Sequence, residues 1–345
     1  MGLHRGRDER DGGPARVGRI PAQEDRATLL MILSTIEPII PFLRHVRIDE
    51  ARARDLAQSL AASDMALPAW RGEVFPEADD DRAASVFCTA NVINFSFWGA
   101  PKWAVAYRGA SYDGTFGLFA ALRRATEEGV PVTDGAYLRD LTADDLARVL
   151  RGNVAIPMFE ERLALLREAG AALCARYGGA WPAFLRASEE SAVRLVERLT
   201  TEMPSFNDVA RIEGREVRFH KRAQLLPAML CGRFGGRSFG AFRDIGALTI
   251  FADYKLPQML RRFDALLYDE GLARRVDACV ELPPGSREEV EIRAAAVWAC
   301  EMVRRACEES VPGVTAAQID AALWHAGQRK ASDDRPYHRT RTIFY

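Results

Sequence analysis

Two aspartates bracket an apolar run in the segment Phe242–Gln258, whose sequence is FRDIGALTIFADYKLPQ. Asp244 precedes the run and Asp253 follows it. A carboxylate held against apolar surface has a perturbable pKa, and solvent screens its charge poorly. Catalytic acids, catalytic bases and groups that stabilise a cation need such surroundings. The segment therefore indicates a site for carboxylate chemistry.

On residue types alone, a structural role is the simpler interpretation of Asp253. Pro257 suits the first turn of a helix, and apolar residues recur around it at helical spacing. Asp253 could then cap this helix by accepting backbone N–H bonds, where the helix dipole favours negative charge. The two roles are compatible, because a capping carboxylate can also face a pocket. The apolar positions are Leu256, Leu260, Phe263 and Leu267.

Other polar residues could also act on a ligand. Asp208 and Asp320 flank predicted helices, where a cap or an ion pair is the ordinary role of an aspartate. Lys221 opens a predicted helix. Arg339 and Arg341 would share one face of an extended strand and could bind a phosphate, although solvated surface arginines fit the pattern equally well. The absence of a G-x-S-x-G motif and the presence of only five histidines argue against a serine or cysteine hydrolase.

The composition excludes several classes of protein. Lys plus Arg number 47 and Asp plus Glu 48, a balance that argues against polymeric nucleic acid as the main partner. No run approaches the roughly 18 apolar residues of a membrane span. The six cysteines form no C-x-x-C pair or metal-ligand cluster, so we expect free thiols, a reducing cytoplasmic location and no metal.

Helices dominate the predicted secondary structure. Capping patterns mark helix starts at Thr142 and at Ser286, where Glu289 completes a capping box. We expect helices over residues 28–43, 50–63, 116–128, 142–150, 160–177, 188–203 and 286–309, and from Lys221 onward.

A minor β element is also expected. Residues 86–98 are rich in β-branched and aromatic types, and residues 102–107 alternate, so the two segments should pair. Residues 79–82 should form an exposed turn. Residues 1–22 mix charges with glycine and predict a disordered tail. Because no linker divides residues 23–345, the expected fold is a single domain, mainly α with a minor β element.

Five motifs, in order and at similar spacing, resemble the queuosine salvage protein family from about residue 40 onward. They are Asn94–Trp98 (NFSFW), Lys221–Gln224 (KRAQ), Phe251–Gln258 (FADYKLPQ), Arg287–Arg293 (REEVEIR) and Tyr337–Tyr345 (YHRTRTIFY). The resemblance implies a fold similar to helix-hairpin-helix DNA glycosylases. It also implies an N-glycosidase that releases the base queuine from queuosine 5′-phosphate for reuse in tRNA.

The resemblance implies that Asp253 is the catalytic carboxylate. Phe251 and Tyr254 would lie near the base or ribose, and Asp320 would contact the base. Asp320 or Asp208 would face the amine of queuine, and Lys221, Arg339 or Arg341 the 5′-phosphate. Asp244 and Tyr345 complete the expected substrate contacts. At Asn91 and His325 an acidic residue would be expected instead.

The expected partner is a small-molecule substrate, with no metal, organic cofactor, stable nucleic-acid partner or membrane. Cleavage of an N-ribosidic bond passes through an oxocarbenium-like state. Asp253 would stabilise this cation, attack the anomeric carbon or deprotonate the attacking water. Two alternatives stay open: a non-catalytic carrier of queuine or its nucleotide, and an enzyme that acts on nucleic acid.

Overall fold

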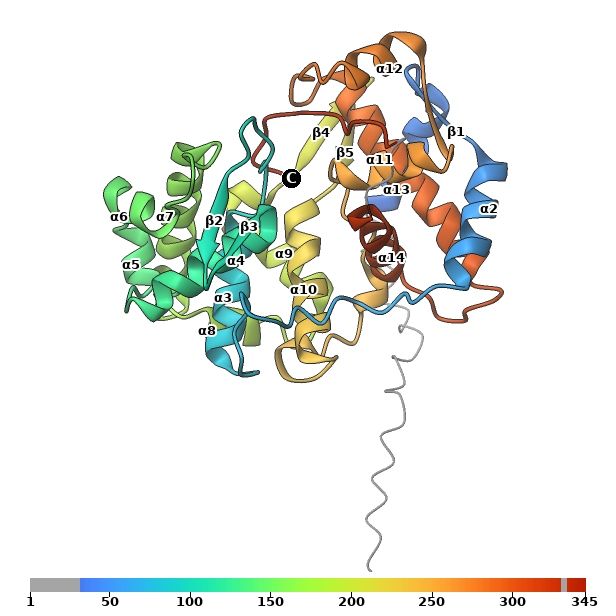
Figure 1. Cartoon of the computed structure of the whole chain (residues 1–345). Helices are drawn as coiled ribbons and strands as arrows, with labels where there is room; N and C mark the ends of the chain where they lie inside the picture. The colour runs from blue at the N-terminus through green and yellow to red at the C-terminus, as the bar shows by residue number, and fades with distance from the viewer. Residues whose placement is uncertain (1–31, 330–333) are drawn as a thin grey trace, which may run out of the picture.

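Helices make up most of the computed structural model, which describes residues 32–329 and 334–345 (Figure 1). The α-helices are α2 (Glu50–Ala61), α3 (Asp81–Val92), α4 (Gly114–Glu127), α5 (Gly135–Arg139), α6 (Ala143–Val149), α7 (Phe159–Arg176), α8 (Trp181–Arg186), α9 (Ala192–Glu202), α10 (Lys221–Phe234), α11 (Lys255–Arg262), α12 (Glu270–Asp277), α13 (Arg287–Cys307) and α14 (Ala316–Gln328). Short 3-10 helices cover η1 (Glu37–Phe42), η2 (Pro204–Phe206), η3 (Ser238–Gly240) and η4 (Ile245–Ala247). The predicted class, mainly α with a minor β element, is confirmed.

The strands form antiparallel pairs. Two of these pairs are local hairpins, and the third joins distant parts of the chain, with Val46 opposite Tyr268. In that third pair, the segment before α2 is tied to the segment after α11. The pairs are β1 (Val46–Ile48) with β6 (Leu266–Tyr268), β2 (Ala104–Tyr107) with β3 (Ala110–Asp113), and β4 (Val209–Ile212) with β5 (Arg215–Arg218).

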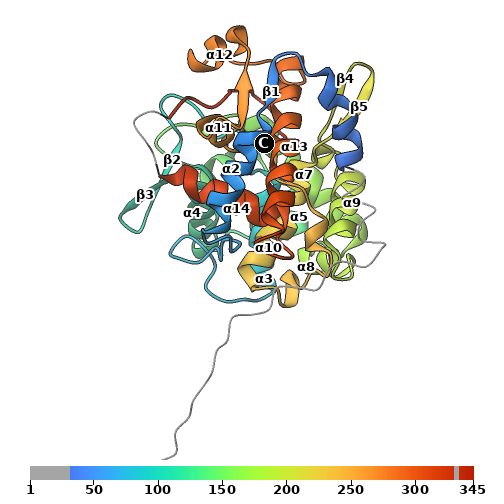
Figure 2. The ribbon, with the colours of Figure 1, turned by 90° about the vertical axis from the view of Figure 1, so that its right-hand side faces the viewer.

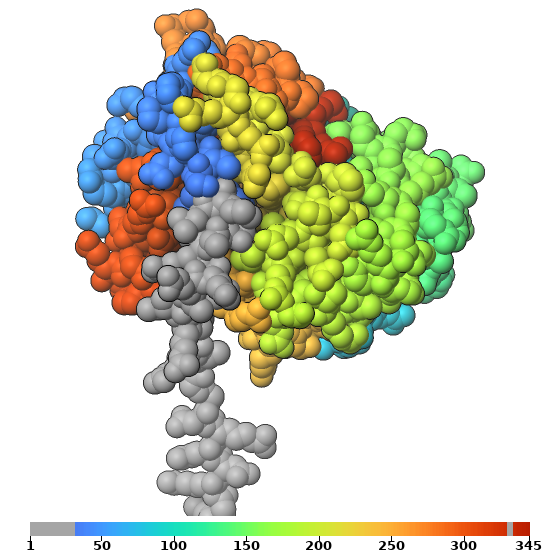
Figure 3. All heavy atoms as spheres, turned by 180° about the vertical axis from the view of Figure 1, so that it is seen from behind, coloured from blue at the N-terminus to red at the C-terminus, as the bar shows by residue number. Residues whose placement is uncertain are grey.

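Buried apolar side chains form two clusters. The first gathers side chains from α3, α4 and α7 to α10, and the second from η1, α2, α11, α13 and α14. Helix α2 packs on α13 although the two lie far apart in sequence (Figures 1 and 2). The view from behind shows the blue and orange segments on one side, the green segments on the other and yellow segments between them (Figure 3).

The segment before α11 lies where these two clusters meet. Leu248 and Phe251 pack in the first cluster, whereas Ile250 and Ala252 pack in the second. Ile250, Phe251 and Ala252 thus alternate between the two clusters, so this short segment joins both. Asp253 follows directly and is therefore held at the junction.

The predicted strand at residues 86–98 is wrong. Residues 81–92 form α3, which Asp80 caps by accepting the N–H of Ala83 at 2.8 Å. Every residue from Ala83 to Val92 is buried, so this helix has no polar face and its sequence lacks the usual helical period. The strand at 104–107 instead pairs with 110–113.

Several helix boundaries also differ from the predictions. Asp264, with φ of 54°, ends the predicted helix after Asp253, and Leu266–Tyr268 continues as a strand. The helix expected from Ser188 starts at Ala192, because Glu189 and Glu190 both have positive φ and form a turn.

Other predictions agree with the structure or lie outside it. The starts of α6 and α13, capped by Thr142 and Ser286, are confirmed. Residues 1–22 lie outside the described residues, and the single domain stays a prediction. In the described ranges, no helix is both long and apolar enough to cross a membrane.

Candidate active site

A cavity of about 620 Å³, its open mouth included, is lined by residues of the first cluster and by Asp253, which follows the segment that joins the two clusters. Apolar and aromatic side chains line it together with the ionisable side chains of Lys221, Asp253 and Asp320. The lining residues are Leu67, Pro68, Trp70, Asn94, Thr115, Lys221, Leu225, Ala228, Met229, Phe251, Asp253, Ala317, Asp320, Ala321 and Trp324. A concave site with a few converging polar groups is the usual form of a small-molecule site.

A wider cleft of about 1040 Å³ is lined by residues of α8 and of the loops around Glu189 and Phe239. Two of its lining side chains pair with each other, Arg186 with Asp81 at 2.8 Å, and Glu189 pairs with Arg194 outside the lining. Among the described residues, none of those that line this cleft is a predicted site residue. The smaller cavity is therefore the candidate active site.

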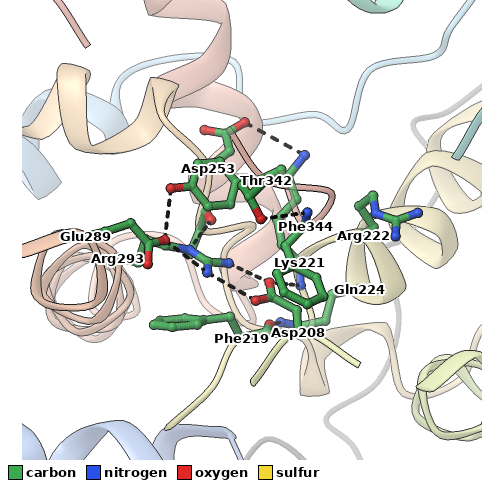
Figure 4. Close-up of polar contacts among 12 residues, drawn as sticks. Asp208, Phe219, Lys221, Arg222, Gln224, Asp253, Glu289, Arg293, Thr342 and Phe344 are labelled. Atoms are coloured by element: carbon green, nitrogen blue, oxygen red, sulfur yellow. Dashed lines mark hydrogen bonds and ion pairs between the residues drawn. The ribbon is translucent and has the colours of Figure 1, made fainter. Parts of the chain in front are cut away.

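Asp253 occupies the N-terminal end of α11, where it caps the helix and also lines the cavity. Its Oδ1 accepts the backbone N–H groups of Lys255 at 2.7 Å and Leu256 at 3.2 Å. Its Oδ2 lies 3.9 Å from the Nζ of Lys221, and Figure 4 shows the two side chains facing each other. One oxygen thus caps the helix while the carboxylate lines the cavity.

Lys221 is the first residue of α10, and its side chain is 8% exposed. Its backbone N–H donates to Asp208 Oδ2 at 3.2 Å. Burial lowers the pKa of the Lys221 ammonium group, and the Asp253 and Asp320 carboxylates oppose this shift. The cavity therefore places one cation beside two carboxyl groups.

Asp320 lies on α14 and is 6% exposed. Its Oδ2 accepts the N–H of Phe251 at 2.8 Å, which ties α14 to the residue two before Asp253. Burial raises the pKa of the Asp320 carboxyl group well above its usual range, and the Asp253 charge adds to the shift. A buried carboxyl group with a raised pKa that lines a cavity is a feature typical of active sites.

Aromatic rings also line the cavity. The Trp70 and Trp324 rings lie 5.7 Å apart, and Phe116 stacks on Trp324 at 6.3 Å. At the polar edge, Asn94 Oδ1 accepts the hydroxyl of Thr115 at 2.9 Å. A broad apolar wall beside hydrogen-bonding groups suits a planar heteroaromatic ring.

Of the predicted site residues, Phe251, Asp253, Asp320 and Lys221 are brought together in the cavity. Sequence reasoning missed Trp70, Trp324, Asn94 and Thr115 as lining residues. The motif Asn94–Trp98 was the one available signal, because it contains Asn94.

Two predicted aspartate contacts lie outside the cavity lining and are used in packing. Asp208 is 2% exposed and pairs with Arg293 at 2.5 Å. Asp244 is 1% exposed and accepts from the Ser191 hydroxyl and the Ala192 N–H, at 2.5 and 2.6 Å. The expectation that Asp244 contacts substrate is not supported, because its oxygens serve the start of α9.

Three other predicted contacts also lie outside the lining. The Tyr345 hydroxyl donates to Glu289 Oε1 at 2.9 Å, and the ring is buried. The Tyr254 ring packs against Tyr337 with centroids 4.7 Å apart. Arg339 lies over the Trp98 ring at 5.9 Å. The C-terminal segment therefore packs against Glu289, Tyr254 and Trp98.

The model of the queuosine salvage protein family matches residues 74–345. This chain belongs to the queuosine salvage protein family. Among its relatives is the queuosine 5′-phosphate N-glycosylase/hydrolase of Sphaerobacter thermophilus, 42% identical over 321 residues, which are 93% of this chain and 99% of the relative. The protein of the same name from Bos taurus is 33% identical over 323 residues, 88% of this chain and 95% of the relative. The family expected from the sequence motifs is confirmed.

Within this queuosine salvage protein, the two positions where an acid was expected lie away from the cavity lining. Asn91 is fully buried, and its Nδ2 donates to the carbonyl of Arg222 at 2.6 Å. His325 is exposed, with its ring 5.2 Å from that of Trp324. Among the residues that the structure describes, no group of three or more His, Cys, Asp or Glu side chains could hold a metal ion.

Proposed function

We propose that this protein hydrolyses the N-glycosidic bond of queuosine 5′-phosphate and releases queuine. The observation that carries the proposal is the convergence of Asp253, Lys221 and Asp320 in a cavity with an aromatic wall. The names of the relatives support the same activity. We also propose the finer fold likeness, to helix-hairpin-helix DNA glycosylases, which the helical content supports and a superposition would test.

The chemistry needs a negative charge beside the anomeric carbon. In the hydrolysis the bond from C1′ to the base nitrogen breaks, a bond from C1′ to a water oxygen forms, and the base gains a proton. Positive charge develops on the ribose in the transition state. Asp253 would supply the opposing charge, and each role open to it, as nucleophile, cation stabiliser or base toward water, uses that carboxylate.

The leaving base needs hydrogen bonds rather than protonation at N7, because queuine is a 7-deazaguanine. A neutral Asp320 carboxyl group can donate a hydrogen bond to a base that gains negative charge. Phe251, Trp70 and Trp324 offer apolar surface for the ring. Of the cations predicted for the 5′-phosphate, Lys221 is the one that lines the cavity.

Incubation of the protein with queuosine 5′-phosphate, followed by chromatography with mass detection, tests the proposal. The expected result is free queuine and ribose 5-phosphate in equal amounts. Guanosine 5′-phosphate should release no base. Recovery of the intact nucleotide, together with saturable binding in a calorimeter, would instead establish a carrier. A salt-dependent mobility shift with tRNA would support a nucleic-acid substrate.

A further inference from the structure

We propose that Arg293, with Asp208 as its partner, is a positioning residue that sets the placement of Asp253 relative to Lys221. The effect on catalysis that we infer rests on the proposed function, whereas the effect on the placement of Asp253 does not. Arg293 lies on α13, outside the cavity lining, and is 2% exposed. It bonds the residue directly before Asp253 and, through Asp208, the backbone at Lys221.

On the Asp253 side, the Nε of Arg293 donates to the carbonyl of Ala252 at 3.0 Å. Ala252 is the residue directly before Asp253, so this bond fixes the peptide from which the carboxylate projects. The Asp253 side chain itself is held by the start of α11. One hydrogen bond from Arg293 therefore locates the carboxylate relative to α13.

On the Lys221 side, Arg293 acts through Asp208. Its Nη1 and Nη2 donate to Asp208 Oδ1 and Oδ2 at 3.1 and 2.5 Å. Asp208 Oδ2 in turn accepts the backbone N–H of Lys221 at 3.2 Å, and the Asp208 carbonyl accepts those of Phe219 and His220. The start of α10 is thus tied to the same guanidinium group that holds Ala252 (Figure 4).

Ring packing and charge hold this guanidinium group in place. It lies 3.9 Å from the Phe219 ring centroid and 4.4 Å from that of Tyr345. Burial acts to lower the pKa of Arg293, but the Asp208 and Glu289 carboxylates outweigh it and raise the pKa, so the group stays charged. A planar, charged fork with fixed bond directions can orient two chain segments at once, which a lysine ammonium cannot do.

The separation of 3.9 Å between Lys221 Nζ and Asp253 Oδ2 depends on these two segments. Arg293 joins them through Ala252 and Asp208. The side chain of Gln224 on α10 also exchanges two hydrogen bonds of 2.8 Å with Thr249, four residues before Asp253, so the bond to Ala252 is the join that lies next to the carboxylate. Displacement of a reacting group by about 1 Å can cost about 100-fold in rate. Loss of the fork should therefore change turnover more than substrate affinity.

The test compares Arg293→Lys with a matched control, Arg261→Lys. Arg261 is also buried, pairs with Asp277 at 2.9 Å and lies 4.4 Å from the Tyr268 ring, but at the far end of α11. We expect Arg293→Lys to lower kcat about 10- to 100-fold with KM unchanged. Arg261→Lys should lower the melting temperature and leave kcat unchanged.

The pH profile gives a readout that a purely structural role would not move. The Lys221 ammonium is faced by Asp253, Asp320, Arg222 and Arg293, and the Asp253 charge raises its pKa. Arg293→Lys keeps the charge at 293, so displacement of Asp253 should shift the alkaline limb of the kcat profile to lower pH. An unshifted limb with wild-type kcat would overturn the proposal.

A crystal structure of each variant separates this proposal from the proposed function. We expect the Lys221–Asp253 distance to lengthen in Arg293→Lys and to stay unchanged in Arg261→Lys, whether or not the wild-type protein hydrolyses the nucleotide. An unchanged distance in Arg293→Lys refutes the positioning role alone. If Arg293→Lys does not fold, Asp208→Asn, which keeps the side-chain shape, should show the same lengthening and the same fall in kcat.

Discussion

Replacing Asp253 by asparagine and, separately, by alanine separates the two roles of this side chain. Asparagine keeps an oxygen that can accept the N–H groups of Lys255 and Leu256, whereas alanine does not. Asparagine and aspartate are comparable helix caps, and loss of a cap to alanine costs about 0.5–2 kcal/mol. Both variants remove the same charge from beside Lys221, so that loss is common to them.

The catalytic effect follows from the charge. Two unit charges about 4 Å apart interact by about 4 kcal/mol at an effective dielectric constant of about 20. Asp253 Oδ2 lies 3.9 Å from one cation already, and an oxocarbenium carbon in the cavity would lie at a similar distance. A barrier raised by about 4 kcal/mol lowers kcat roughly 1000-fold. We expect this loss in both variants.

Initial rates of queuine release and denaturant unfolding of the same preparations measure the two effects. We expect equal losses of kcat for Asp253→Asn and Asp253→Ala, with a lower free energy of unfolding for the alanine variant. This expectation is refuted if Asp253→Asn keeps a rate within about tenfold of wild type, since that is a barrier change of only about 1.4 kcal/mol.

Three other side chains give sharp tests. Because the pKa of Asp320 is raised, the free energy of unfolding should fall as pH rises from about 4, and Asp320→Asn should remove this dependence in urea titrations; an unchanged slope would contradict a neutral Asp320. Burial lowers the pKa of His338 to about 3, so the free energy of unfolding should fall as pH falls below about 6.5, by up to about 5 kcal/mol. His338→Gln should make this fall with pH less steep, and an equally steep fall would rule out His338 as its source. Asp244→Ala should lower the free energy of unfolding by about 3 kcal/mol, because the start of α9 loses its acceptor, and should leave KM unchanged. A raised KM would instead indicate that Asp244 contacts the substrate.

Helix starts were predictable where the signal is local. Thr142 accepts the N–H of Asp145, and Ser286 accepts that of Glu289, as their spacing indicates. The capping box at Ser286 is incomplete, because Glu289 Oε2 accepts from Gly285 instead. Local patterns therefore located the helices better than they described the exact bonds.

The error at α3 has a tertiary cause. Its β-branched and aromatic residues are buried on every side, so composition resembled a strand while the Asp80 cap marked a helix. Burial by neighbouring helices overrides such propensities. The same cause hides the strand pair β1–β6, which joins distant segments.

The site was predictable in its ionisable residues and not in its walls. The family motif indicated a catalytic role for Asp253, and Lys221 and Asp320 were predicted as substrate contacts. Trp70 and Trp324 reach the cavity from a loop and from α14, and nothing in their local sequence indicates that they meet. Asp208 was assigned to substrate, and its hydrogen bonds instead connect Arg293 to Lys221.

A crystal structure of Asp253→Asn with queuosine 5′-phosphate bound tests the central claim most directly. The account predicts the base against Trp70 and Trp324, its polar edge at Asp320, and the anomeric carbon within about 3.5 Å of the substituted side chain, a near-attack distance. The claim would be contradicted if the anomeric carbon lay at Asp320 or in the cleft beside Phe239, while the side chain at position 253 bonded only the start of α11.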